Sequence, residues 1–214
     1  MPIVHHRQPS VLSYLHWMLA RIFVKPVLAL GPVNKPVFAL LAALERGAEK
    51  QRPPRSVVIE RVALGGRPAE LVMAKAPTSG ATDTAVLYLH GGGFLSCGPG
   101  THRTITASLA KGLGVPVFAL DYRQLPEVGV GTSVHDAFEA YRELLGQRGY
   151  RHVVVAGDSA GGYLTGKVAE LASVNDVPAP TALAMLSPWL DLDIGDRDDR
   201  TSRHDAYLPI RQLA

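Results

Sequence analysis

The feature that most constrains the fold is an alternation of short apolar runs with amphipathic segments between Ser56 and Leu190. The later runs are apolar throughout, as expected for strands of a parallel sheet that is covered on both faces. The alternation predicts an α/β fold with a doubly wound, mostly parallel sheet, opened by an antiparallel pair of strands. We expect strands at 57–62, 70–74, 85–89, 115–120, 153–156 and 183–186, and helices at 101–113, 134–145 and 160–173.

The first 52 residues have a different pattern. Apolar residues recur at helical spacing over 11–23 and 37–46, and a basic stretch with prolines at 50–55 is typical of a linker. We therefore expect an N-terminal helical segment, residues 1–52, and an α/β core, residues 53–214. Charged residues interrupt the apolar region well before the roughly 20 residues that a membrane span needs. Residues 1–7 lack the features of a secretory signal, so we expect a cytoplasmic protein and leave a membrane-peripheral location open.

Composition excludes several classes of protein. With 47% hydrophobic and 19% charged residues, the chain is too apolar to be intrinsically disordered. The net charge of +3 comes from dispersed Lys and Arg, which argues against a nucleic-acid partner. Cys97 is the single cysteine, so a disulfide framework is excluded, and no Cys/His spacing fits zinc. The aspartates between 191 and 199 lack the calcium-loop pattern. We expect no metal site.

A serine between glycines is the strongest chemical signal. The sequence Gly157-Asp-Ser-Ala-Gly161 follows an apolar strand and precedes a helical segment. A tight strand-to-helix turn needs glycine on both sides and lifts the serine hydroxyl clear of the sheet. The helix N-terminus then places backbone N–H groups beside that hydroxyl.

Three consecutive glycines follow another strand, in His90-Gly-Gly-Gly-Phe94. Their N–H groups can converge on one small anion, as the tetrahedral intermediate of acyl transfer requires. The N–H of Ala160, directly after the serine, should complete such an oxyanion hole. A glycine-rich phosphate cradle is the alternative, but the sequence lacks the Lys-Ser/Thr pair of a P-loop.

Four motifs together resemble the hormone-sensitive-lipase family of α/β-hydrolase esterases. They are His90-Gly-Gly-Gly-Phe94, Asp121-Tyr-Arg123 with Pro126-Glu127, Gly157-Asp-Ser-Ala-Gly-Gly162 and Ser187-Pro-Trp-Leu-Asp191. The resemblance covers about residues 56–190 and implies carboxylic-ester hydrolysis, of a small-molecule or lipid substrate, without a cofactor. It implies that Ser159 is the nucleophile and that Gly91, Gly92 and Ala160 supply the oxyanion hole. His90 would stabilise its loop.

Other residues receive smaller roles. Asp158 fits the family motif, and we expect a solvated or capping carboxylate there. Asp121 and Arg123 are expected to form a structural ion pair. Phe94 and Tyr163 are expected to line the mouth of the substrate site. The family often covers its acyl pocket with N-terminal helices, so residues 11–44 are interpreted as a lid, with core packing and interfacial binding as alternatives.

The catalytic acid and base raise a separate expectation. In this architecture the triad runs Ser, then Asp or Glu, then His, and the family places the last two about a hundred residues beyond the serine. The chain has 214 residues, and His204 is the only histidine after Ser159. We therefore expect a chain truncated at the C-terminus, with the apolar strand at 183–186 as an exposed edge that favours self-association. A catalytically inactive remnant is the alternative function.

Overall fold

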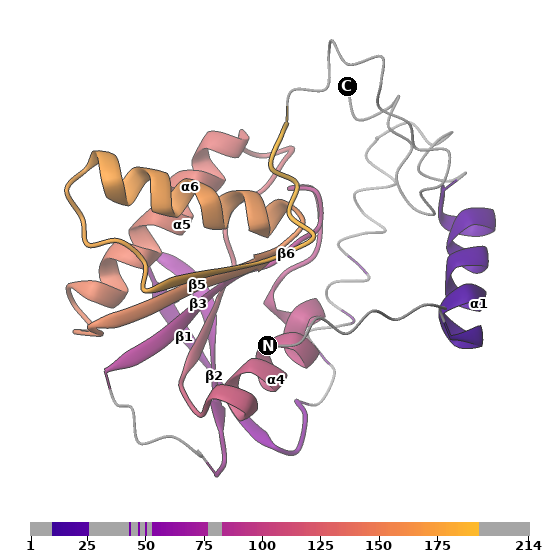
Figure 1. Cartoon of the computed structure of the whole chain (residues 1–214), viewed down its shortest axis with the longest axis horizontal. Coiled ribbons are helices and arrows are strands. Elements are labelled where there is room, and N and C mark those ends of the chain that lie inside the picture. Colours follow the sequence, from indigo (N-terminus) through magenta and orange to yellow (C-terminus); the bar gives the residue numbers. More distant parts are fainter. Residues whose placement is uncertain are drawn as a thin grey trace, which may run out of the picture. The chain divides into compact units, whose positions relative to one another are not determined.

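The structure is a computed structural model, and it describes residues 10–25, 43, 47, 50, 53–76 and 83–192 (Figure 1). The chain divides into two compact units, residues 1–37 with 191–214, and residues 38–190. The helix expected at 37–46 falls almost entirely outside the described residues, as do His204 and most of the aspartates between 191 and 199. The boundary at residue 52 stays a prediction.

The larger unit is built on one six-stranded sheet with the order β1-β2-β4-β3-β5-β6. β1, β2 and β4 pair in antiparallel fashion, whereas β4, β3, β5 and β6 are parallel. The expected antiparallel opening and parallel remainder are therefore confirmed. The strands are β1 (Val57–Leu64), β2 (Arg67–Ala74), β3 (Thr84–Leu89), β4 (Val117–Leu120), β5 (His152–Asp158) and β6 (Ala182–Leu186).

Among the described residues, three helices cover this sheet. They are α4 (Arg103–Leu113), which follows a short 3-10 turn at Pro99–His102, α5 (Val130–Leu145) and α6 (Ala160–Val174). α5 and α6 lie together on one face, and α4 lies on the other (Figure 1). The expected helices are confirmed, although α5 begins four residues earlier than the apolar pattern indicated. Its first turn includes Gly131 and starts from an extended Gly129, and neither residue carries an apolar side chain to signal it.

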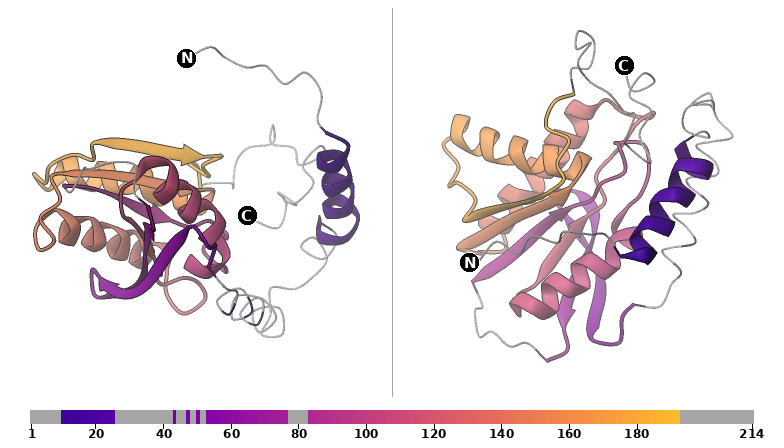
Figure 2. Two further views of the ribbon diagram at one scale, coloured as in Figure 1. Left: turned by 90° about the horizontal axis from the view of Figure 1, so that it is seen from below. Right: turned by 45° about the vertical axis from the view of Figure 1, so that its right-hand side comes forward.

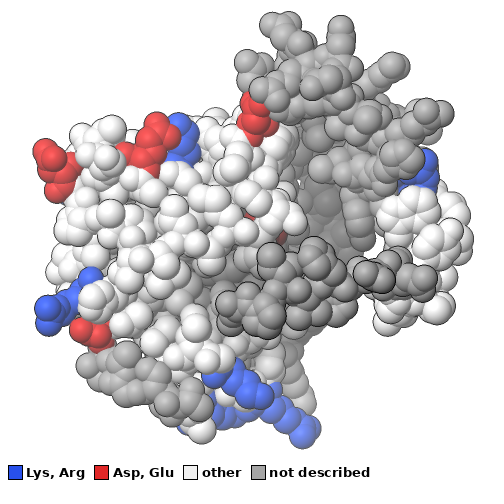
Figure 3. All heavy atoms as spheres, in the orientation of Figure 1, with Lys and Arg blue, Asp and Glu red and all other residues white. Residues whose placement is uncertain are grey.

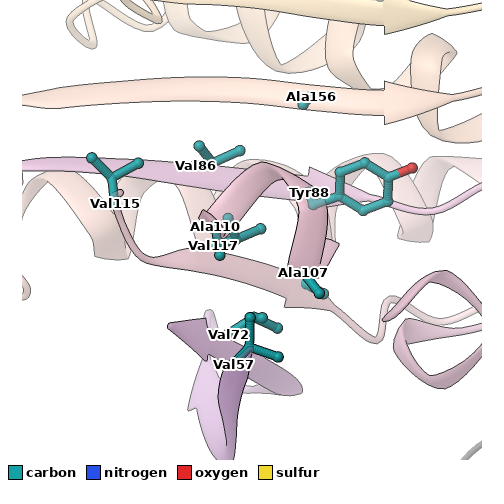
Figure 4. Close-up of a cluster of buried hydrophobic side chains, with 10 residues drawn as sticks. Val57, Val72, Val86, Tyr88, Ala107, Ala110, Val115, Val117 and Ala156 are labelled. Atoms are coloured by element: carbon teal, nitrogen blue, oxygen red, sulfur yellow. The ribbon is translucent and has the colours of Figure 1, made fainter. Parts of the chain in front are cut away.

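The α4 side of the sheet has a compact apolar core. Val86 and Tyr88 of β3 point into it, together with Ala107 and Ala110 of α4 (Figure 4). Successive strand residues point to opposite faces, so Leu87 and Leu89 point to the other face of the sheet. The side chains of residues 86–89 are all buried. β3 is therefore packed on both faces, and the loop that follows it starts from a strand that is held in place.

β6 ends the sheet among the described residues, and it differs from the central strands. Leu183 and Leu186 are 43% and 48% exposed, whereas β3 is almost wholly buried. Within the described residues β6 pairs with β5 alone, so the expected apolar edge at 183–186 is present there. Self-association through this edge stays a prediction.

The smaller unit contributes one described helix, α1 (Val11–Leu19), continued by a π-helical turn at Ala20–Val24 (Figure 2). Ser10 caps it, because its hydroxyl accepts a hydrogen bond from the Ser13 N–H at 3.1 Å. Apolar side chains are exposed along the helix, among them Val11, Leu12, Tyr14, Leu15 and Ile22. Within the described ranges, no helix is long and apolar enough to cross a membrane. The lid, core-packing and interfacial interpretations remain predictions.

The surface charge is dispersed on the face that Figure 3 shows. Acidic and basic side chains of the described residues lie side by side near the top and at the left edge of this view, and several basic side chains gather at its lower edge. Uncharged surface separates these groups.

Candidate active site

Ser159 stands on a sharp turn between β5 and α6. Its backbone has a φ of 50° and a ψ of −117°, a conformation that non-glycine residues rarely adopt. The turn is held on both sides, because the Ser159 N–H donates to the Leu186 carbonyl at 3.1 Å and the Ser159 carbonyl accepts from the Trp189 N–H at 2.9 Å. The segment after β6 therefore braces the serine, whose side chain is half-buried at the carboxyl end of the sheet.

The glycines around Ser159 allow a close approach to β3. A Cβ on Gly161 would collide with the carbonyl oxygens of Leu89 and His90, and one on Gly157 would lie 2.7 Å from the Leu89 oxygen. Both positions therefore exclude a side chain. The helix that follows the serine is thereby brought against the end of β3, where the glycine loop begins.

The glycine loop turns sharply after His90. Gly92, Gly93 and Phe94 all have positive φ, at 128°, 65° and 62°. The N–H groups of Leu95 and Ser96 both donate to the Gly92 carbonyl, at 3.1 and 3.2 Å, and so close the turn. Gly91 is buried, whereas Gly92 and Gly93 are partly exposed. In the described part of the chain, neither of these two N–H groups has a hydrogen-bond acceptor.

Gly91 does not fit the role of an oxyanion donor. Its N–H donates to Asp158 Oδ1 at 3.0 Å, so that hydrogen is already used within the protein. This contact argues against the role expected for Gly91, since one N–H cannot serve the partly buried Asp158 carboxylate and a reacting oxygen equally well. The three glycines are identical in the sequence, and only the folded loop shows which one faces Asp158.

Asp158 is also not the solvated residue that we expected. The Tyr88 hydroxyl donates to Asp158 Oδ1 at 2.7 Å, and His102 Nε2 lies 3.4 Å from the same oxygen. Burial alone would raise the pKa of Asp158, but hydrogen bonds from His102 and Tyr88 hold this pKa below its ordinary value. Tyr88 and His102 were not expected from the sequence, because they come from a strand and a turn that are far from Asp158 in the chain.

His90 lies in the packing of the glycine loop. Its Nδ1 donates to the Gly91 carbonyl at 2.8 Å, and its ring stacks on Tyr122 with centroids 4.3 Å apart. The Tyr122 hydroxyl donates to the His90 carbonyl at 2.7 Å. Burial lowers the pKa of His90 to about 4, so its imidazole is neutral near neutral pH. The loop-stabilising role expected for His90 is compatible with these contacts.

Phe94 lies inside the protein rather than at an opening. Its side chain is 2% exposed, so the expectation that Phe94 lines a mouth is wrong. The ring packs edge-on against Tyr163 at 5.9 Å and lies 6.4 Å from the ring of Trp189. Tyr163 and Trp189 are both partly exposed, so solvent can reach these two aromatic side chains.

The expected Asp121–Arg123 ion pair is also corrected. Arg123 pairs with Asp136 of α5, with Nη2 and Nε at 2.6 and 3.0 Å from the carboxylate oxygens. Arg67 Nε lies 3.6 Å from the same carboxylate. Although burial opposes ionisation, the hydrogen bonds from Arg123 and the two positive charges hold the pKa of Asp136 below its ordinary value.

The remaining candidates for chemistry are metal-ligating side chains, Cys97 and the histidines. In the described ranges, no cluster of three or more His, Cys, Asp or Glu side chains could hold a metal ion. Cys97, near the glycine loop, is half-buried and lies 3.9 Å from Ser96 Oγ. No histidine of these ranges hydrogen bonds to the Ser159 side chain.

Comparison with known proteins gives one family and several relatives. A family model described as an alpha/beta hydrolase fold matches residues 86–214. The chain is 36% identical over 209 residues to carboxylesterase/phospholipase LipF of Mycobacterium tuberculosis, covering 95% of this chain and 55% of LipF.

Two solved structures are similar in fold. EstE5 soaked with p-nitrophenyl butyrate has a TM-score of 0.74 and 29% identity, covering 88% of this chain and 61% of EstE5. A hormone-sensitive lipase from a metagenome library has a TM-score of 0.72 and 33% identity, covering 86% of this chain and 60% of the lipase. The chain thus spans a little more than half the length of these proteins.

Proposed function

Because this chain belongs to the hormone-sensitive-lipase family of α/β-hydrolases, we propose that it hydrolyses carboxylic esters through an acyl-enzyme on Ser159. One observation carries the proposal: Ser159 stands at a φ of 50° between β5 and α6, directly against the glycine loop that follows β3. A serine hydroxyl and free backbone N–H groups on adjacent turns form the arrangement that acyl transfer needs.

The reaction has two steps. Ser159 Oγ attacks the ester carbonyl carbon while its proton passes to a general base, and the alcohol then leaves with that proton. Water attacks the acyl-enzyme in the second step, which releases the carboxylic acid and restores the serine. His204, the only histidine after Ser159, lies outside the described residues and is the first base to test.

The oxyanion of each tetrahedral intermediate would be held by the N–H groups of Gly92, Gly93 and Ala160. Gly92 and Gly93 are partly exposed and have no acceptor in the described part of the chain, whereas the Gly91 N–H is used by Asp158. Ala160 is the first residue of α6, so its N–H is not needed within the helix. Each such donor typically contributes a factor of about 10² to 10³ in rate.

The substrate class is an ester with a short or medium acyl chain. Tyr163 and Trp189 support this assignment, because they offer partly exposed aromatic surface beside the buried Phe94. LipF carries the name carboxylesterase/phospholipase and EstE5 was soaked with a butyrate ester, which agrees with an acyl substrate.

The test is hydrolysis of p-nitrophenyl butyrate by the purified chain and by Ser159→Ala. We expect the wild-type chain to release p-nitrophenol and Ser159→Ala to lower kcat/KM at least about 10³-fold. Ser173→Ala is the matched control, because Ser173 is an exposed serine of the same helix, and its rate should equal that of the wild type.

Two results would count against the proposal. Equal hydrolysis by the wild type and Ser159→Ala would assign the activity to another group. A folded wild-type chain that releases no p-nitrophenol above the uncatalysed rate would make this chain inactive towards such esters. If activity is found, His204→Ala then shows whether His204 is the base.

A further inference from the structure

Three donors from three separate segments converge on one oxygen beside the nucleophile. Asp158 Oδ1 accepts hydrogen bonds from the Tyr88 hydroxyl of β3 at 2.7 Å and from the Gly91 N–H of the glycine loop at 3.0 Å. His102 Nε2, at the start of α4, lies 3.4 Å from the same oxygen. Asp158 directly precedes Ser159, so this carboxylate connects the glycine loop to the nucleophile turn.

His102 is oriented so that its Nε2 faces the Asp158 carboxylate, which only accepts when it is ionised, so Nε2 carries the hydrogen of this contact. Nδ1 lies 2.8 Å from the Thr101 hydroxyl oxygen and 3.2 Å from the Gly98 carbonyl oxygen. The Thr101 hydroxyl also donates to that carbonyl at 2.8 Å. These contacts on Nδ1 keep the ring of His102 turned with Nε2 towards Asp158.

The groups that surround His102 and Asp158 are neutral or paired elsewhere. Burial and the Asp158 carboxylate raise the pKa of Tyr88, so its hydroxyl stays neutral. Burial lowers the pKa of His90, whose ring centroid lies 5.6 Å from that of His102. Arg103, the next residue, has its guanidinium paired with Glu70 of β2, with Nε to Oε2 at 3.0 Å.

We propose that Asp158 and His102 are positioning residues that hold the glycine loop at the distance from Ser159 that oxyanion stabilisation requires. The inference rests on the proposed ester hydrolysis. Asp158 reaches Gly91 rather than Gly92 or Gly93, so it fixes the loop and leaves the next two N–H groups for the reacting oxygen. A displacement of about 1 Å in such a site can lower the rate by about 10²-fold, so the pair should affect kcat more than substrate binding.

Asp158→Asn tests the charge, because it keeps the size of the side chain and an acceptor oxygen. We expect kcat for p-nitrophenyl butyrate to fall about 10- to 100-fold, with KM changed less than about threefold. His102→Ala should lower kcat similarly, and His102→Gln should restore part of the loss, because its amide can still donate to Asp158.

The matched control is the exposed pair at the other end of β5. His152 Nε2 lies 4.0 Å from Asp83 Oδ2, and both side chains are about half exposed. Asp83→Asn and His152→Gln should leave kcat and KM unchanged. Unchanged kcat in folded Asp158→Asn and His102→Ala would overturn the proposal.

Two readouts do not depend on activity, so the pair can be judged even if the chain hydrolyses no ester. Nitrogen NMR of the wild type should show a hydrogen on His102 Nε2, the nitrogen that faces Asp158, and a hydrogen on His90 Nδ1, the nitrogen that faces the Gly91 carbonyl. In Asp158→Ala, hydrogen exchange of the Gly91 amide should accelerate at least about tenfold, because its acceptor is removed. A wild-type His102 without a hydrogen on Nε2, or unchanged Gly91 exchange, would contradict the pair.

If the ester test fails while these two readouts succeed, the proposed function is wrong and the pair is only a structural clamp. If the wild type is active and folded Asp158→Asn keeps its kcat, the positioning role is wrong and the proposed function stands. The two failures are therefore distinguishable.

Discussion

Asp158 and Asp136 are both largely shielded from solvent, yet they are held in different ways. Asp136 of α5 accepts from the Arg123 backbone N–H at 3.0 Å and from its guanidinium, with Arg67 close by. Asp158 accepts from a tyrosine hydroxyl, a backbone amide and a histidine. One carboxylate faces two permanent charges, whereas the other faces neutral donors and one group that can titrate.

This difference assigns the two aspartates to different tasks. The Asp136 group fastens the segment after β4 to α5, and the Ser133 hydroxyl adds a hydrogen bond to the Arg123 carbonyl at 2.6 Å. The Asp158 group lies next to Ser159 and the glycine loop. We therefore expect substitutions at Asp136 to change stability, and substitutions around Asp158 to change the rate of the reaction.

The largest effect on stability is expected for Asp136→Ala. The substitution leaves Arg123 and Arg67 without the carboxylate that they share. The Asp136 side chain is only 3% exposed. We expect the free energy of unfolding to fall by about 3 kcal/mol, at the low end for a buried pair because both arginines remain partly hydrated. Urea unfolding measures the change, and kcat of the folded fraction should stay the same. A loss below about 1 kcal/mol would remove the contrast between the two aspartates.

The next effect concerns acid stability on the Asp158 side. The pKa of the buried His90 is about 4, below the roughly 6.5 of an unfolded histidine, so the unfolded state binds more protons between these values. The free energy of unfolding should therefore decrease as the pH falls through this window, by about 2 kcal/mol between pH 6.5 and 4.5. Urea unfolding of the wild type and of His90→Gln at both pH values measures this decrease in the free energy of unfolding. An equal pH dependence in the two proteins would contradict a neutral, buried His90.

A smaller effect is expected when one donor to Asp158 is removed. Tyr88→Phe should lower the free energy of unfolding by about 1 kcal/mol and kcat several-fold, because Asp158 keeps its other two donors. Tyr141→Phe is the matched control, since the Tyr141 hydroxyl donates to the Pro178 carbonyl at 2.6 Å, away from the glycine loop. It should have a similar loss of stability with unchanged kcat. Equal kcat values for the two variants would count against the positioning role of Asp158.

The smallest effect is expected for an exposed ion pair. Glu139 and Arg142 lie one turn apart on α5, with 3.0 Å between Oε1 and Nη1 and 54% of the arginine side chain exposed. Glu139→Ala should change the free energy of unfolding by less than about 0.5 kcal/mol. Thermal or urea unfolding of Glu139→Ala and of Asp136→Ala under the same conditions compares the two losses of stability. A change as large as that of Asp136→Ala would show that burial does not separate the two pairs.

The sequence predicted the sheet and its helices because their signals are local. Apolar runs gave the positions of β3, β5 and β6 to within two residues at each end, and the motifs gave the turns at Ser159 and after His90. The start of α5 was missed, because its first turn has a glycine where an apolar residue would have marked it.

The errors in the candidate site concern contacts between residues distant in the sequence. Arg123 was expected to pair with Asp121, but its partner Asp136 is brought close by the packing of α5. Asp158 was expected to be solvated, although its partners Tyr88 and Gly91 come from 70 and 67 residues earlier in the chain. No local pattern reports such distances, and no property of three identical glycines reveals which N–H is already bonded.

The most direct test of the account is covalent modification of Ser159 by phenylmethanesulfonyl fluoride. The Ser159 oxygen would displace fluoride from the sulfonyl group, and mass spectrometry of the peptide His152–Lys167 would detect the sulfonyl ester. We predict a single adduct, located on Ser159, absent from Ser159→Ala and unchanged in Ser173→Ala. No adduct on the folded chain, or the same adduct in Ser159→Ala, would contradict the assignment of Ser159 as the nucleophile.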